Sequence, residues 1–388
     1  MNKDFKTRQV VTISAAHLSH DIFSSFLAPL LPLLIAKLGL SLAMAAVLDV
    51  VRKGPALFNP FIGLLADRIC MKYMVIVAPA ITATTMCLLG VAPTFPILII
   101  LLVVGGVSAV VFHVPGPVLI KYYSGDKTGR GMSFFMFGGE LARTLGPLLI
   151  TAALSIWGLE GSIRVLPLGL VATILLYFRL RDLEPMDRKK QDSQDGAEKE
   201  SVRSHIPLLA GIGGFLLFRM GIKSALTLYL PTYLVGQGET LWIGGGALAL
   251  LQMAGALSTF ASGYIADRFG HRRTLVAIAI LTPPVALALT FSQGWLMVPL
   301  LALVGFLLFS SGPILLALVQ DTDTNRPAFI NSLFMTMNWL AGAVAVLFVG
   351  FLGDQVGLEA AFKVGAALSI LAIPFLILIK SKFVHPKG

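Results

Sequence analysis

Long apolar stretches recur along the whole chain and are separated by short polar segments. Most of them reach about 20 residues, the length that an α-helix needs to cross the hydrocarbon core of a bilayer. Backbone groups in lipid have no water to bind, so such stretches form helices. The pattern predicts twelve spans, near residues 10–37, 43–66, 73–92, 96–120, 131–157, 162–180, 206–235, 241–266, 274–292, 295–320, 327–352 and 358–380.

One long charged segment, residues 181–204, divides this pattern into two sets of six spans. Its composition is typical of a solvated tether. We therefore expect an N-terminal six-helix bundle over residues 1–180, a cytoplasmic linker over 181–204 and a C-terminal six-helix bundle over 205–388. The expected fold class is an all-α membrane protein.

Composition agrees with this interpretation. Hydrophobic residues make up 56% of the chain and charged residues 13%, whereas soluble domains are about a quarter charged. The mean hydropathy is +0.85, which excludes soluble, fibrous and disordered classes. The two cysteines provide neither a disulfide framework nor metal-ligand spacing, and we expect no cofactor.

The net charge of +10 reflects membrane topology and does not indicate nucleic-acid binding. Lys and Arg residues gather in the segments that face the cytoplasm if both termini lie there. The expected outside loops contain only Lys37, Arg164 and Lys363. An even number of spans with this bias predicts cytoplasmic termini.

The two halves carry the same short motif where their second spans end. A basic stop signal at the membrane interface explains the basic residues, but it does not explain a repeated G-x-x-x-D-R. The glycine allows close helix packing, and the aspartate can accept the free N–H groups of a helix N-terminus. The repeated residues are Gly63, Asp67 and Arg68 in the first half and Gly263, Asp267 and Arg268 in the second.

These loops resemble the signature of the major facilitator superfamily, although Cys70 stands where glycine is usual. The resemblance extends over the whole chain through the span count, the linker and the repeat. It implies two six-helix bundles around a central cavity, with transport by alternating access. It also implies that Asp67 and Asp267 belong to latches that gate transport on the cytoplasmic side.

A narrower resemblance is to the fosmidomycin-resistance branch, which shows H-x-x-x-D in span one, a Phe-His pair before a proline in span four and a Gly-rich run in span five. The matching residues are His17, Asp21, Phe112, His113, Gly138, Gly139, Gly146 and Pro147. Val114 is inserted before Pro115, and Glu140 and Arg143 stand where small or neutral residues are usual. The branch is associated with proton-driven export of drugs and other small compounds.

Ionisable side chains within spans are costly and mark a pathway or coupling site by default. The candidates are Asp21, Asp49, Arg52, Lys53, Glu140, Arg143, Arg219 and Lys223. Cations outnumber anions in this set, which favours an anionic substrate that arginine can bind bidentately. Helical spacing also allows internal pairing of Asp49 with Arg52 and Lys53, and of Glu140 with Arg143. Further candidates for substrate contact are Gln252, Asn331, Asn338 and Trp339.

Three histidines form a group with the first-span carboxylate. His17 and Asp21 are one helical turn apart, His20 is adjacent, and His113 lies in another span expected to line the cavity. One interpretation is a proton site, because a carboxylate and a neighbouring histidine can share a proton. The alternatives are a transition-metal site and a set of hydrogen bonds without titration. Neighbouring cations disfavour a bare metal ion, so we expect proton coupling and no resident metal.

The sequence thus predicts a secondary active transporter of a bacterial inner membrane, a monomer that acts on a small molecule and protons and does not bind nucleic acid. The leading hypothesis is proton-coupled export of a small organic anion or drug-like compound. The alternatives are import of an organic anion or metal chelate, and movement of a lysolipid. A membrane-embedded enzyme is disfavoured because the sequence contains no G-x-S-x-G and no H-E-x-x-H motif.

Overall fold

A computed structural model describes residues 5–59, 71–181, 205–320, 322 and 327–379. Within these ranges the backbone forms helices and turns, and no strand occurs. The linker residues 182–204 and the first latch residues Gly63, Asp67 and Arg68 lie outside the described part of the chain. The all-α fold class is confirmed.

Ten helical stretches of the described residues have the length and apolar composition to cross a membrane. One of them, Phe95–Trp157, has 63 residues and includes two of the predicted spans. The predicted span 43–66 is only partly described, so it is absent from the ten. The expected twelve spans are compatible with this result, and the chain is a multi-pass membrane protein.

Contacts divide the chain into two compact units. The first comprises Met1–Lys190 and Leu230–Ala249, and the second comprises Gln191–Tyr229 and Leu250–Gly388. The domain limits at residues 180 and 205 stay a prediction.

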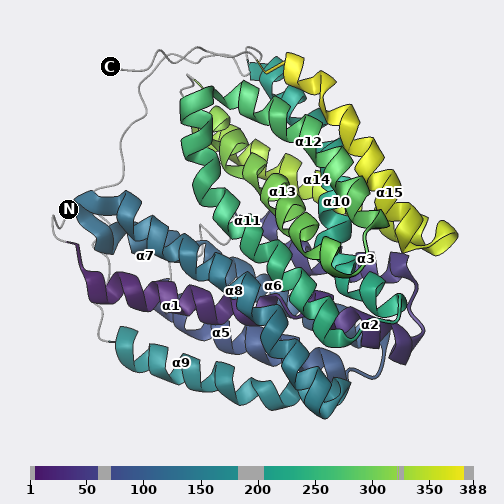
Figure 1. Ribbon diagram of the computed structural model, residues 1–388. Helices are drawn as coiled ribbons and strands as arrows, with labels where there is room; N and C mark the ends of the chain where they lie inside the picture. Colours follow the sequence, from purple (N-terminus) through teal and green to yellow (C-terminus); the bar gives the residue numbers. More distant parts are fainter. Residues whose placement is uncertain (1–4, 60–70, 182–204, 321, 323–326, 380–388) are drawn as a thin grey trace. The chain divides into compact units, whose positions relative to one another are not determined.

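The first unit is built around α1 (Figure 1). This helix packs against α8, α5, α7 and α9. The described helices that lie wholly in the unit are α1 (Thr7–Ser24), α2 (Leu27–Leu38), α3 (Leu42–Lys53), α5 (Met71–Leu88), α6 (Phe95–His113), α7 (Pro115–Ser124), α8 (Thr128–Trp157) and α9 (Leu166–Leu180). Short 3₁₀ turns connect them at Gly54–Phe58, Leu89–Val91, Gly125–Lys127 and Leu159–Val165. Because α1 lies in the middle of its unit, the side chains of Ser14, His17, His20 and Asp21 are buried among neighbouring helices.

Prolines interrupt three of the predicted spans. Span 10–37 is divided into α1 and α2, because Pro29 has no N–H to donate to the carbonyl of Ser25. Span 96–120 is divided at Pro115, so His113 ends α6. In span 43–66, Gly54-Pro55 follows directly after α3. The first two breaks place Asp21 and His113 near helix ends.

Glycines allow α8 to approach α1 closely. A Cβ added at Gly138 would overlap the carbonyl oxygen of Ser14, and one added at Gly146 would overlap Ser25 and the carbonyl of Ile22. Small residues at such positions let two helix backbones meet. The Gly-rich run of the fifth span therefore has a packing role that brings α8 against the histidines of α1.

The second unit contains most of α10 and α11 and all of α12 to α15. The bounds are α10 (Ile206–Gly236), α11 (Leu241–Phe269), α12 (His271–Phe291), α13 (Met297–Gln320), α14 (Pro327–Val356) and α15 (Leu358–Leu368), with 3₁₀ turns at Gly294–Leu296, Ser369–Ala372 and Pro374–Ile377. Its core gathers Phe215, Leu275, Leu315 and Ile330, all fully or almost fully buried. Large apolar side chains such as Leu257 and Ile377 are exposed, as expected for a surface that faces lipid.

Candidate functional site

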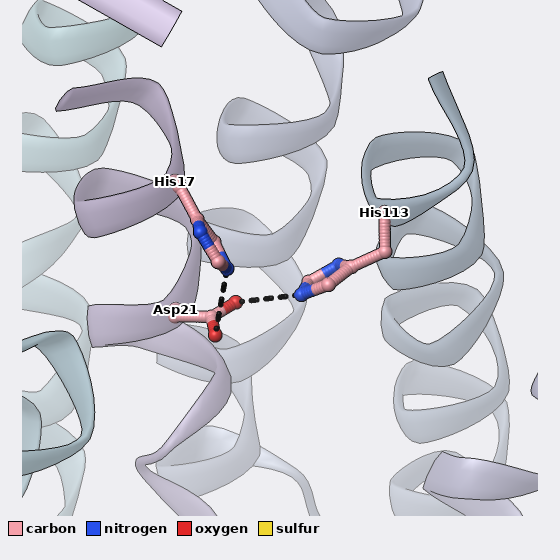
Figure 2. Close-up of side chains that lie close together, drawn as sticks. All are labelled: His17, Asp21 and His113. Carbon is pink, nitrogen blue, oxygen red and sulfur yellow. Dashed lines mark ion pairs between the residues drawn. The ribbon is translucent and has the colours of Figure 1, made fainter. Parts of the chain in front are cut away.

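Asp21 of α1 is buried at the centre of a group of three imidazoles. Nε2 of His17 lies 3.3 Å from Oδ2 of Asp21, and Nδ1 of His20 lies 2.9 Å from Oδ1. Nε2 of His113, from α6, lies 3.4 Å from Oδ1 (Figure 2). The structure therefore brings together the four residues that the sequence proposed for proton coupling.

A guanidinium from α8 completes this group. NH2 of Arg143 lies 4.0 Å from Oδ2 of Asp21, and NH1 lies 2.8 Å from Oε1 of Glu140. Without any charge on the imidazoles, Asp21, Glu140 and Arg143 together carry a charge of −1. The Asp21 cluster is defined here as Asp21, His17, His20, His113, Arg143 and Glu140, and in this state one added positive charge would make it neutral.

Backbone carbonyls fix the tautomers of two of the rings. Nδ1 of His17 lies 2.7 Å from the carbonyl oxygen of Phe135, and Nδ1 of His113 lies 2.9 Å from that of Ala109. A carbonyl oxygen only accepts hydrogen bonds, so each Nδ1 carries the hydrogen. In a neutral ring, Nε2 then presents a lone pair to Asp21.

The third ring is connected to a short chain of hydroxyl groups. Nε2 of His20 lies 2.9 Å from Oγ1 of Thr82 on α5, and Thr82 donates to Ser108 on α6 at 2.9 Å. Ser108 in turn donates to the carbonyl oxygen of Ala78 at 2.8 Å. Sequence reasoning missed Thr82 and Ser108, although a hydroxyl within a strongly apolar span is a signal that could have marked them.

Aromatic rings and a glycine hold the imidazoles in place. The ring of His17 stacks on that of Phe135 with centroids 4.0 Å apart, and the ring of His20 stacks on that of Phe112 at 4.7 Å. A Cβ added at Gly139 would come within 2.5 Å of the His17 ring. Gly139 thus leaves the space that this ring occupies.

The charges of α3 pair with one another. Asp49 is buried, and its carboxylate contacts NH2 of Arg52 at 2.9 Å and Nζ of Lys53 at 2.5 Å. Arg52 also lies 3.4 Å from the carbonyl oxygen of Ser24. The internal pairing that helical spacing allowed is therefore present, as it is between Glu140 and Arg143.

Arg219 of α10 belongs to the second unit and has a different environment. Its side chain is buried, and Nε and NH1 donate to Ser311 and Thr282, each at 3.1 Å. NH2 donates to the carbonyl oxygen of Leu307. Within the described part of the chain no carboxylate pairs with Arg219, so its partners there are neutral.

The remaining predicted residues of the second half are not brought into one cluster by any described contact. Oε1 of Gln252 is buried and has no hydrogen-bond partner among the described residues. Asn338 and Trp339 are half-buried on α14, and the Asn331 side chain lies outside the described set. Nζ of Lys223 lies 4.5 Å from the centroid of the Phe309 ring.

The second latch motif lies at the end of α11. Asp267 and Arg268 occupy its last turn and are exposed, whereas Gly263 is half-buried. The guanidinium of Arg268 lies 5.7 Å from the centroid of the Phe269 ring. The latch role of this motif stays a prediction.

A sequence model of the Major Facilitator Superfamily matches residues 13–346. The chain belongs to this superfamily. It is therefore a transporter and not an enzyme, as the sequence predicted.

The individual proteins that this chain resembles share only low sequence identity with it. The chain is 23% identical over 371 residues to the fosmidomycin resistance protein of Escherichia coli (strain K12), covering 93% of this chain and 90% of the relative. It is 24% identical over 377 residues to the MFS-type transporter YfnC of Bacillus subtilis (strain 168), covering 94% and 91%. The resemblance to the fosmidomycin-resistance branch is thus confirmed.

Solved structures support the same fold. A bacterial homologue of the human lysosomal transporter Spinster, inward-facing and occupied, matches with a TM-score of 0.80 at 14% identity and covers 97% of each chain. A D-xylose–proton symporter matches with a TM-score of 0.74 at 13% identity, covering 96% of this chain and 97% of the symporter. At these identities the likeness establishes the fold of the major facilitator transporters.

Proposed function

We propose that this transporter exports a small organic anion or drug-like compound in exchange for protons, by alternating access in a bacterial inner membrane. In this proposal the protein is a monomer with both termini in the cytoplasm. The observation that carries it is the Asp21 cluster, in which one buried carboxylate faces three imidazoles and a guanidinium.

The proton step uses the charge of this cluster. With neutral imidazoles the cluster carries −1, so one bound proton neutralises it. Histidine is the side chain whose charge ordinarily changes near neutral pH, which suits exchange between two compartments. The groups that face the proton are His17 and His20 of α1, Thr82 of α5, His113 of α6, and Glu140 and Arg143 of α8.

The anion is proposed to bind to arginines. The side chains of Arg52 and Arg143 are 24% and 43% exposed, so each keeps a face for a ligand beside its carboxylate. Arg219 has only neutral partners among the described residues. Supporting contacts are proposed for Asp49, Lys53, Glu140, Gln252, Asn331, Asn338 and Trp339, and gating for Gly63, Asp67, Arg68, Gly263, Asp267 and Arg268.

Exchange requires that proton and substrate exclude each other. A substrate N–H or O–H group that binds Asp21 needs the same carboxylate oxygens as the proton. Binding of one species then lowers the affinity for the other, and the linkage is reciprocal. A substrate with both an anionic group and a hydrogen-bond donor satisfies both parts of the proposal.

One contact favours a second candidate, proton-driven uptake of an organic anion. Arg143 lies between Glu140 and Asp21, at 2.8 Å and 4.0 Å. If a proton neutralises the Asp21 cluster, more of the Arg143 charge becomes available to an anion. Proton and anion would then bind together, as symport requires.

Thermal stabilisation of the purified protein tests the substrate class. The ligands are phosphonates, phosphate esters, carboxylate chelators, lysophospholipids and cationic dyes, since binding to the folded state raises the melting temperature. We expect small anions to stabilise the protein and this effect to be lost in Arg52→Ala but kept in Lys363→Ala, which removes a cation outside the proposed site. Stabilisation by cationic dyes or lysolipids alone contradicts the anion proposal.

Direction is tested in proteoliposomes with the most stabilising anion. Export by antiport predicts that, under an imposed proton gradient, the anion moves in the direction opposite to that of the protons. Accumulation in the same direction as the protons supports uptake instead, and transport that ignores the gradient overturns proton coupling.

A further inference from the structure

Two ring nitrogens near Asp21 face the carboxylate without a hydrogen when their rings are neutral. His17 and His113 each donate Nδ1–H to a backbone carbonyl, which leaves both Nε2 atoms as acceptors. Nε2 of His17 is buried and has no hydrogen-bond partner among the described residues. Two lone pairs therefore converge on an anion, an arrangement that calls for a cation between them.

The outer contacts of these rings are those of metal-binding histidines. A histidine that ligates a metal almost always donates its other ring N–H to a carbonyl, a carboxylate or water, which fixes the tautomer and the ring orientation. Phe135 and Ala109 provide such carbonyls for His17 and His113. Stacking on Phe135 further restrains the His17 ring.

The distances between the inner atoms suit a small divalent ion. Zinc binds nitrogen and oxygen at about 2.0–2.2 Å with tetrahedral geometry, so neighbouring ligand atoms lie about 3.4 Å apart. Nε2 of His17 lies 3.3 Å from Oδ2 of Asp21 and Nε2 of His113 lies 3.4 Å from Oδ1, so each nitrogen is at about this spacing from one of the two oxygens of the same carboxylate. One ligand atom from each of His17, Asp21 and His113 lies within 4.8 Å of the others, and Figure 2 shows the three side chains pointing toward one another.

We propose that Nε2 of His17, Nε2 of His113 and the carboxylate of Asp21 bind one first-row transition-metal ion, with Zn²⁺ as the representative. Imidazole and carboxylate are suitable ligands for such ions. The side chain of His113 is 40% exposed, which gives the ion access to an otherwise buried group. This proposal does not rest on the proposed function.

The net charge of the site indicates which kind of fourth ligand the metal ion would take. The nearby guanidinium of Arg143 is 4.0 Å from Asp21, but Glu140 offsets it at 2.8 Å. With neutral rings, the Asp21 cluster changes from −1 to +1 when a divalent ion binds. The three protein ligands leave one tetrahedral position open, and an anionic ligand there restores neutrality. The expectation of no resident metal rested on the neighbouring cations, because sequence does not reveal which ring nitrogens carry hydrogen.

The test is Zn²⁺ titration of the purified full-length protein in detergent, after treatment with a chelator. We expect one Zn²⁺ per chain by calorimetry, and Co²⁺ in its place should give the visible absorption of a tetrahedral nitrogen–oxygen site. His113→Ala and Asp21→Asn should each weaken Zn²⁺ binding at least tenfold. His271→Ala is the matched control, because His271 lies on α12 of the second unit, and it should keep the affinity of the parent protein.

The melting temperature measured without metal identifies variants that do not fold. If His113→Ala is one of them, His113→Gln is used in its place. The proposal is overturned by the absence of saturable Zn²⁺ binding in the parent protein. It is equally overturned if folded His113 and Asp21 variants bind Zn²⁺ as tightly as the parent. Proton-driven transport is measured separately in proteoliposomes, so that a failure of metal binding and a failure of proton coupling give different results.

Discussion

Two buried charges of this transporter are stabilised in opposite ways. Asp21, in the first unit, is an anion surrounded by three imidazoles and a guanidinium. Arg219, in the second unit, is a cation whose described partners are two hydroxyls and a carbonyl. Burying an isolated charge is costly, and neutral hydrogen bonds recover only part of that cost.

The difference indicates what each position accepts. In the proposals above, the first position binds an added cation, which is a proton or a metal ion. The second carries a positive charge that no carboxylate pairs with among the described residues and that an anion would neutralise. The excess of cations that the sequence revealed is therefore unevenly distributed, because Asp49 and Glu140 of the first unit pair with their own neighbours.

Removal of the carboxylate charge has the largest expected effect. Asp21→Asn keeps the shape of the side chain but removes the charge that we propose binds a proton. We expect transport driven by a proton gradient to fall at least tenfold, while exchange of labelled for unlabelled substrate across the same membrane persists. Proteoliposome assays with and without the gradient measure both.

Glu160→Gln provides the matched control, since Glu160 is exposed and lies outside the Asp21 cluster. Its gradient-driven transport should equal that of the parent protein. If Asp21→Asn still concentrates substrate at the parental rate, the proposed role of Asp21 in proton coupling is wrong.

Removal of the other charge should stabilise the fold. Arg219→Met replaces a buried cation, which has only neutral partners among the described residues, by an apolar side chain of similar length and so removes the cost of burying that charge. We expect a higher melting temperature together with weaker stabilisation by organic anions. Arg179→Met, at an exposed position of α9, should change stability by less than about 0.5 kcal/mol. A lower melting temperature for Arg219→Met would show that its neutral partners fully compensate the charge.

A substitution that crowds the His17 ring tests how closely the Asp21 cluster is packed. A Cβ at residue 139 meets this ring, so Gly139→Ala should lower the free energy of unfolding by about 1–3 kcal/mol. Gly129→Ala on the same helix meets nothing within 4 Å and should be neutral or stabilising by about 0.5–1 kcal/mol. Denaturation in detergent compares the two variants, and equal effects would mean that the ring moves aside freely.

The smallest expected effect is at the hydroxyl chain behind His20. Thr82→Val removes the oxygen that contacts Nε2 of His20 and should cost about 1 kcal/mol, with slower proton-driven transport. Thr84→Val is the matched control, because among the described residues the Thr84 hydroxyl bonds only to the carbonyl of Ala80 on its own helix. Identical stability and transport of the two variants would exclude a role for this chain in the Asp21 cluster.

Features that depend on local sequence were predictable. Span lengths follow from apolar runs, and the His17–Asp21 contact follows from helical spacing. For contacts between helices, the sequence indicated only which types of residue could pair. Which residues meet depends on how each helix is rotated and shifted along its axis, and packing sets both. The sequence therefore indicated His113 as a neighbour but not the approach of Arg143 to Asp21. The prolines were visible, but their effect on spans 10–37 and 96–120 depends on how the flanking segments pack. The neutral surroundings of Arg219 come from α12 and α13, far away in the sequence.

The contact between α8 and His17 has a mechanical consequence. One residue, Phe135, both stacks on the imidazole and accepts its hydrogen bond, and Gly139 closes the space one turn further along the same helix. The ring is thus held by α8 although it belongs to α1. If α8 slides or turns along α1, it pulls the ring with it and changes the distance from Nε2 to Asp21. Movement of one helix would in this way be transmitted to the atoms that are proposed to hold the proton or the metal ion.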